Sequence, residues 1–135
     1  MISLDTNTVI SALRPADTNH VQALAALFRE RSRGLVLSPP VYSELRAGLD
    51  WPVVQSWLFL TRVFVIWEMP QAVWELAGRR QSEYIALRRG GTVPRRIAAD
   101  FLIAAHAEHH GLDVMSFDRT VYDSMFTGVT LIEPT

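Results

Sequence analysis

Short apolar runs alternate with longer segments of helical periodicity along this sequence, and this alternation constrains the fold more than any other feature. The runs that predict strands are MISL, LVLS, RVFVIW, LDVMS and VTLIE. They are mostly continuous apolar stretches, which is typical of strands buried on both faces of a parallel sheet. The helical segments between them supply the crossovers that parallel strands need. We therefore predict an α/β fold, a three-layer α/β/α sandwich around a central, mostly parallel sheet of four to five strands.

Segments with apolar residues at helical spacing predict the helices between these runs. They cover residues 20–34, 39–48, 50–60, 71–89, 94–111 and 119–125. Ser38, followed by a proline pair, is a helix-start signal, and Gly111 follows a helix end. The polar triplet DTN at residues 5–7 is expected to stop the first strand. No repeat or linker divides the 135 residues, so we predict one domain over residues 1–135.

The composition removes several kinds of chemistry. All 13 basic residues are arginine, and the chain contains no cysteine. This excludes a lysine Schiff base, a P-loop lysine, thiolate zinc sites and cysteine nucleophiles. The net charge of −1 gives no global basic field, although a local nucleic-acid site needs none. The N-terminus runs directly into an acid and no apolar run is long enough to cross a bilayer, so we expect a cytoplasmic protein without membrane contact.

Four acidic residues, far apart in the sequence, are predicted to meet at one edge of the sheet. Asp5 and Asp118 follow the first and fourth strands, and Glu44 lies early in the helix after the second strand. Asp100 lies early in the helix that leads back into the fourth strand, so it also falls at the carboxyl edge. Open α/β sheets bind their ligands at this edge, where the strand order reverses.

Each acid also has an ordinary structural explanation. Asp5 can cap the following turn, Asp100 can decorate a helix N-terminus, Asp118 can be a turn residue, and Glu44 can be a surface glutamate. These explanations do not account for a shared edge. Two carboxylates about 4 Å apart repel by roughly 4 kcal/mol at an effective dielectric constant near 20. We therefore predict a divalent cation between them, and oxygen ligands favour Mg²⁺ or Mn²⁺.

The motifs LDTN, SPPVYSEL, ADFLIAAHA and SFD, taken in order, resemble the signatures of PIN-domain ribonucleases. They are most similar to those of VapC-type toxins from bacterial toxin–antitoxin pairs, and the likeness covers nearly the whole chain. The resemblance implies a metal-dependent endoribonuclease with one or two Mg²⁺ or Mn²⁺ ions. It assigns the catalytic and metal-binding roles to Asp5, Glu44, Asp100 and Asp118. It places Thr6 or Asn7, and Ser116, beside them as polar supporting groups.

The resemblance also implies partners. Such toxins act on RNA, usually form homodimers, and are silenced by a cognate antitoxin, through which alone they reach operator DNA. Relatives often carry a further acid directly after the fourth, where this chain has Arg119 and Thr120. Whether Asp123 replaces that acid is left open by the sequence.

An arginine pair precedes Asp100 by about one turn. Arg95 and Arg96 are candidate RNA phosphate contacts, because arginine forks match phosphate oxygens. The alternative is solvated surface charge. Arg88 and Arg89 are weaker candidates, because they end a helix, where cations are favourable in any case.

Two other functions compete with the ribonuclease. DTNTV at residues 5–9 echoes the first motif of haloacid-dehalogenase-like phosphatases, but Asn7 stands in place of their second aspartate and the expected lysine is missing. The non-enzymatic alternative is a catalytically inactive binding module with a PIN-like fold. Cleavage of RNA, release of phosphate from monoesters, or neither would separate the three.

Overall fold

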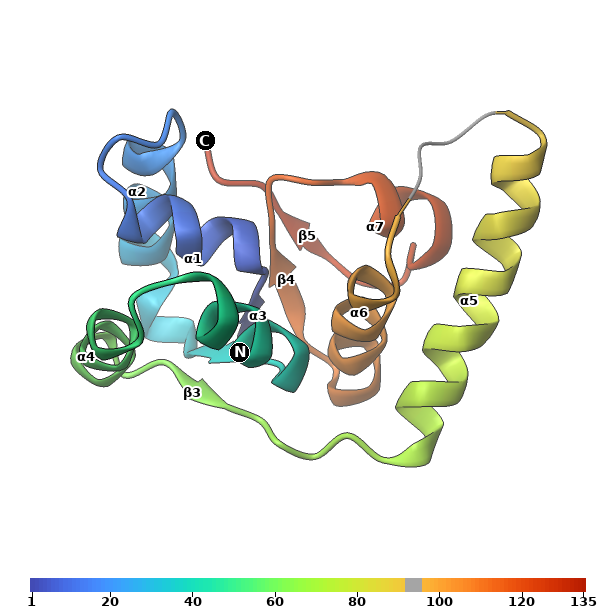
Figure 1. Cartoon of the computed structure of the whole chain (residues 1–135), viewed down its shortest axis with the longest axis horizontal. Coiled ribbons are helices and arrows are strands. Elements are labelled where there is room, and N and C mark those ends of the chain that lie inside the picture. The colour runs from blue at the N-terminus through green and yellow to red at the C-terminus, as the bar shows by residue number, and fades with distance from the viewer. Residues whose placement is uncertain (92–95) are drawn as a thin grey trace.

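The computed structural model describes residues 1–91 and 96–135, and five parallel strands form its central sheet (Figure 1). The strands are β1 (Ile2–Leu4), β2 (Leu35–Leu37), β3 (Phe64–Val65), β4 (Asp113–Met115) and β5 (Leu131–Ile132). Their order is β3-β2-β1-β4-β5, and every pairing is parallel. The predicted fold class is confirmed, and the first strand of the chain is the central strand of the sheet.

Helices connect the strands and cover the sheet. They are α1 (Thr6–Leu13), α2 (His20–Glu30), α3 (Pro39–Gly48), α4 (Trp51–Thr61), α5 (Gln71–Arg89), α6 (Ala98–His110) and α7 (Thr120–Met125), with a 3₁₀ turn at Arg31–Arg33. Most begin within a few residues of the predicted positions. Helix α6 begins at Ala98 rather than at residue 94, and residues 94 and 95 lie outside the described part of the chain.

Helix α1 was not predicted, and this omission bears on the site. Its sequence, TNTVISAL, is rich in β-branched and short polar residues with weak helix propensity. The triplet DTN predicts the end of the strand and, beyond it, only a turn that Asp5 can cap. In the structure, the Asp5 side chain caps the helix by accepting a hydrogen bond from the Thr6 amide. The strand therefore passes into a helix within one residue, which fixes the position of Asp5.

The strands divide the core into two apolar layers, as a three-layer sandwich requires. Successive residues of a strand face opposite sides, so Leu35 and Leu37 belong to one cluster and Val36 to the other. The first cluster packs mainly residues of α1, α2, α3 and α4, and the second packs residues of α5, α6 and α7. No helix in the described ranges is long and apolar enough to cross a membrane.

Candidate active site

The candidate site lies at the carboxyl ends of β1 and β4, where the strand order reverses. The chain leaves β1 toward β2 on one side, and the later strands β4 and β5 lie on the other side. The Asp5 amide donates to the carbonyl oxygen of Met115 at 3.0 Å, so the residues that follow the two strands start side by side. This is the position at which parallel α/β sheets expose backbone and side chains to a ligand.

Asp5 is held by both of its carboxylate oxygens. Its Oδ1 accepts from the Thr6 amide at 2.8 Å, and its Oδ2 accepts from the Ser116 hydroxyl at 2.7 Å. Ser116 is fully buried, and its Oγ also accepts from the Asn7 side-chain amide at 3.1 Å and from the Asp118 amide at 3.0 Å. One serine hydroxyl therefore connects the loop after β1 to the loop after β4.

Asn7 is a structural part of this network. Its Oδ1 accepts from the Phe117 amide at 3.2 Å while its Nδ2 donates to Ser116. Thr8, to which no motif in the sequence points, donates its hydroxyl to the Met115 carbonyl at 3.0 Å. The side chains of α1 thus lock the end of β4, and Asn7 is turned toward the protein rather than toward a substrate.

Glu44 and Asp100 reach the same edge from two other helices. Thr6 donates its hydroxyl to Glu44 Oε1 at 2.8 Å, which ties α3 to the start of α1. Asp100 lies in the first turn of α6, where its Oδ2 accepts from the Ile97 amide at 3.3 Å. The ordinary explanation of Asp100 as a helix-start residue is thus correct, and it coexists with a place in the site.

Asp118 is bound by a cation of the protein itself. Its Oδ2 lies 3.1 Å from Arg96 Nη2, and its Oδ1 accepts from the Thr120 amide at 2.9 Å. The same Arg96 nitrogen donates to the Thr120 hydroxyl at 3.0 Å. Partial burial raises the pKa of Asp118, but the hydrogen bonds from Thr120 and the Arg96 guanidinium outweigh burial and leave that pKa below its ordinary value.

Three of the four acids line one small depression, together with two buried residues of α7. The lining residues are Asp5, Asp100, Asp118, Val121 and Tyr122. Glu44 is not among them, but it accepts a hydrogen bond from Thr6, the residue after Asp5, and its charge acts on the pKa of Asp5. Within the described residues, no three acidic or histidine side chains converge closely enough to form a ready-made metal cluster. The acids therefore share an edge and a depression, but they do not form a closed coordination shell.

The electrostatics show how costly this arrangement is without a cation. Burial raises the pKa of Asp5 to about 6, and the charges of Asp100 and Glu44 add to this although hydrogen bonds from Ser116 and Thr6 oppose it. The pKa of Asp100 is also raised, first by burial and then by the charges of Asp118 and Glu44, against the hydrogen bond from Ile97 and the charge of Arg96. The protein thus disfavours negative charge on Asp5 and Asp100, whereas Thr120 and Arg96 stabilise it on Asp118.

A divalent ion suits the chemistry of these donors. Carboxylate oxygens are the preferred ligands of Mg²⁺ and Mn²⁺. Burial first, and then the charges of neighbouring acids, raise the pKa values of Asp5 and Asp100, and a bound cation would stabilise their ionised forms. Asp5, Asp100 and Asp118 are the residues placed to hold such an ion, with Glu44 beside them. Because the carboxylates do not converge, an ion would have to draw them together. The metal-binding role of all four acids stays a prediction.

Two other residues, Asp123 and Arg95, were candidates for a role in the site. Asp123 pairs with Arg119, whose Nε lies 3.2 Å from Asp123 Oδ2, and it does not line the depression. Arg95 lies outside the described residues. Tyr122 was missed, because a tyrosine within TVYDSM carries no signal that separates a core residue from one that lines a site.

Comparison with known proteins agrees with this architecture. The family model of the PIN domain matches residues 2–124. The solved structure of FitAcB from Neisseria gonorrhoeae is similar at a TM-score of 0.69 and 26% identity, over 99% of this chain and 98% of that chain. VapBC2 from Rickettsia felis, bound to a promoter DNA fragment, is similar at a TM-score of 0.70 and 18% sequence identity, over 98% of both chains. DNA-bound VapBC from Salmonella typhimurium is similar at a TM-score of 0.69 and 22% sequence identity, over 99% of this chain and 98% of that chain. No curated protein sequence matches the chain significantly.

Proposed function

Because the chain belongs to the PIN-domain family, we propose that it is a VapC-type endoribonuclease that hydrolyses RNA phosphodiester bonds in the cytoplasm with one or two Mg²⁺ or Mn²⁺ ions. The observation that carries the proposal is the depression in which Asp5, Asp100 and Asp118 lie together at the switch point of the sheet. Isolated structural roles explain each acid, but they do not explain why the pKa values of both Asp5 and Asp100 are raised partly by the other acids.

The residues of the chain have distinct tasks in this proposal. A bound divalent ion would supply an activated water and neutralise charge on the phosphate. Asp5, Glu44, Asp100 and Asp118 would hold that ion. Ser116 orients Asp5 Oδ2 and Thr6 orients Glu44 Oε1 through the hydrogen bonds described above. Tyr122, only 5% exposed, closes one wall of the depression against water.

The phosphatase alternative loses its main support. Its resemblance rested on the residues that follow Asp5, where a second acid would have to face the substrate. The corresponding residue is Asn7, whose carboxamide has no acidic proton to give to a leaving group and whose side chain contacts Ser116 and the Phe117 amide. Release of phosphate from a monoester substrate would reopen this alternative.

The test is cleavage of RNA by purified protein with Mg²⁺ or Mn²⁺, compared with the same reaction in EDTA. We expect cleavage only with the metal. Asp100→Asn should reduce the rate by more than about a thousandfold, which corresponds to about 4 kcal/mol of barrier, while its circular dichroism spectrum remains that of the wild type. Asp123→Asn is the matched control, because it removes an acid close by that pairs with Arg119 outside the depression. Full activity of the Asp100 variant would end the assignment, and no cleavage by the wild type would favour an inactive binding module.

An antitoxin and a second copy of the chain are the proposed protein partners, with operator DNA bound through the antitoxin. The support on this chain is exposed apolar surface over α2 and α4, where Phe28 is 66%, Phe59 82% and Leu60 78% exposed. A groove of about 710 Å³ runs between these helices and is lined by Phe28 and Leu60 among others. Large exposed apolar patches mark protein interaction sites. Copurification with the product of a neighbouring antitoxin-like reading frame, and its loss in Phe28→Glu, tests the antitoxin; sedimentation of the chain alone tests the dimer.

A further inference from the structure

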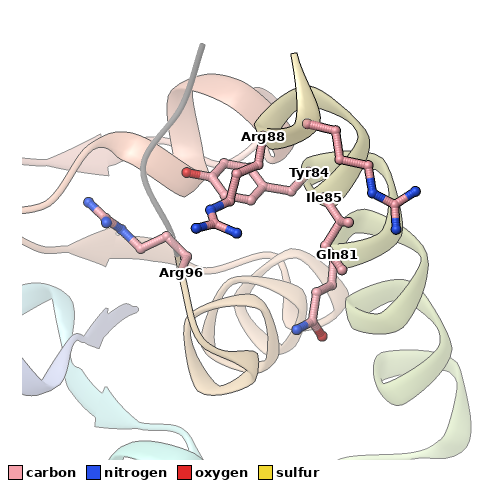
Figure 2. Close-up of a pocket in the computed structure, with 6 residues that line it drawn as sticks. Gln81, Tyr84, Ile85, Arg88 and Arg96 are labelled. Carbon is pink, nitrogen blue, oxygen red and sulfur yellow. The ribbon is translucent and has the colours of Figure 1, made fainter. Parts of the chain in front are cut away.

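A cavity of about 400 Å³, separate from the acidic depression, lies between the C-terminal half of α5 and the segment that enters α6 (Figure 2). The residues that line it are Gln81, Tyr84, Ile85, Arg88, Arg89 and Arg96. Half of them are arginines, and none of these lining residues is acidic. Figure 2 shows Arg88 reaching from α5 toward the segment that carries Arg96. In a chain whose net charge is −1, this is a strongly cationic place.

No acid of the described residues neutralises the charges of Arg88 and Arg89. In the ranges that the structure describes, neither guanidinium forms an ion pair with an acid. The last acid of α5, Glu83, pairs instead with Arg80 at 3.3 Å. The helix dipole accounts for cations in the last turn of α5, but it does not account for a cavity or for a third arginine that lines it from another segment.

Arg96 connects this cavity to the acidic depression. It lines the cavity, and the same side chain contacts Asp118 Oδ2 and the Thr120 hydroxyl. Burial raises the pKa of Tyr84; the charges of Arg96 and Arg88 lower it, and those of Asp118 and Asp100 raise it. Its side-chain hydroxyl therefore lies in the field of both sets of charges. An anionic polymer that occupied the cavity would therefore lie directly next to the carboxylates.

We propose that this cavity binds the backbone phosphates of the RNA strand adjacent to the cleaved bond, with Arg88 and Arg89 as phosphate-binding residues and Arg96 as the positioning residue between the cavity and the acids. The proposal rests on the proposed ribonuclease function and specifies how the substrate is held. Arginine forks bind phosphate oxygens through two parallel hydrogen bonds. A phosphate would compete with Asp118 for Arg96, so substrate binding would release that carboxylate from its internal cation.

The test measures RNA binding without cleavage. A fluorescein-labelled single-stranded RNA of mixed sequence is titrated with the full chain in EDTA, and anisotropy is followed from low to physiological salt. In the double variant Arg88→Gln/Arg89→Gln we expect affinity to fall by about tenfold or more. The slope of log affinity against log salt should become shallower by about 0.7 for each phosphate that the variant no longer binds. Arg88→Lys/Arg89→Lys keeps the charge and should keep most of the slope.

The matched control is Arg29→Gln/Arg79→Gln, which removes the same charge from exposed positions that do not line the cavity. It should leave affinity within about twofold. The cavity assignment is overturned if the two glutamine pairs weaken binding equally, or if Arg88→Gln/Arg89→Gln leaves both affinity and slope unchanged. Thermal melts show whether each variant is folded. If Arg88→Gln/Arg89→Gln has a lowered melting temperature, the single variants Arg88→Gln and Arg89→Gln are titrated instead and judged by the same criteria.

The steady-state readout separates the two proposals. If the wild type cleaves RNA with Mg²⁺ or Mn²⁺, the cavity variant should raise KM with little change in kcat, because the two arginines hold the strand outside the reacting bond. An unchanged KM would remove the cavity assignment and leave the ribonuclease intact. If the wild type does not cleave RNA at all, the ribonuclease proposal fails by itself, and the binding measurement still reports on the cavity.

Discussion

The two halves of the candidate site are held by different forces. The half after β1, with Asp5, Thr6 and Asn7, is fixed by short hydrogen bonds to the buried hydroxyl of Ser116 and to backbone groups. The half around α6 and α7 depends on the ion pair between Arg96 and Asp118, whose side chains are 24% and 43% exposed. A buried polar group that loses its partner costs about 1 to 3 kcal/mol, whereas an exposed ion pair contributes about 0 to 1 kcal/mol.

This difference shows which part of the site is free to respond to a ligand. In the first half, hydrogen bonds hold the carboxylate of Asp5 in place although burial disfavours its negative charge, as its raised pKa shows. The second half carries carboxylates that can exchange their partners at little cost. A site that must close around an ion and a phosphate needs both properties, because a fixed ligand sets the position and adaptable ligands complete the shell.

The largest expected effect concerns the charge on Asp5. Its pKa is about 6 in the folded chain against an ordinary value of 3.8, so between these values the folded state holds the proton more tightly than the unfolded state. Stability from this group is therefore present at about pH 4 and is lost as the pH rises through about 6, by as much as about 3 kcal/mol. Urea unfolding of metal-free protein at both ends of this window measures the loss, to which Asp100 adds in the same direction.

Asp5→Asn should remove the greater part of that loss. An asparagine still accepts from the Thr6 amide, so the helix cap survives. If the variant and the wild type lose the same stability between the two pH values, ionisation of Asp5 does not cause the loss. The proposed difference between the two halves of the site would then be wrong.

A smaller effect is expected for Ser116→Ala. The variant leaves Asp5 Oδ2, the Asn7 amide and the Asp118 amide without their shared partner. We expect the free energy of unfolding to fall by about 2 kcal/mol, measured by urea unfolding near pH 7. Ser82→Ala, at an exposed position on α5, is the control and should change stability by less than about 0.5 kcal/mol.

The smallest effect is expected for Arg96→Gln in the second half of the site. Because its ion pair with Asp118 is partly exposed, we expect a change in the free energy of unfolding below about 1 kcal/mol. Unfolding curves of the two proteins at physiological salt give this number. A loss as large as that of Ser116→Ala would mean that both halves are equally rigid.

The sequence predicted that the acids share one edge of the sheet, because this placement depends only on topology. In a parallel sheet, the residues after β1 and β4 and those at the start of α3 and α6 must meet at one edge, whatever their side chains. The predicted resemblance to PIN-domain, VapC-type toxins is confirmed by the family model over residues 2–124 and by the similar solved structures. The resemblance also named Ser116, although not the number of hydrogen bonds that meet at its hydroxyl.

Other features depend on local energetics and could not be predicted. Helix α1 has weak intrinsic propensity and forms because Asp5 caps it and the core covers it. Trp67 and Trp74 are 58% and 54% exposed, whereas Trp51 and Trp57 pack against the core, and no sequence pattern separates the two pairs. The Arg96–Asp118 contact joins residues from two loops whose side-chain directions no sequence pattern records.

Calorimetric titration of the metal-free chain with Mn²⁺ tests most directly whether the acids of this edge form one cation site. We expect binding by the wild type together with a rise in melting temperature, retention of both in Asp123→Asn, and loss of both in Asp5→Asn and in Asp100→Asn. Heat of binding that is absent from the wild type, or that survives both of the latter substitutions, would contradict the account.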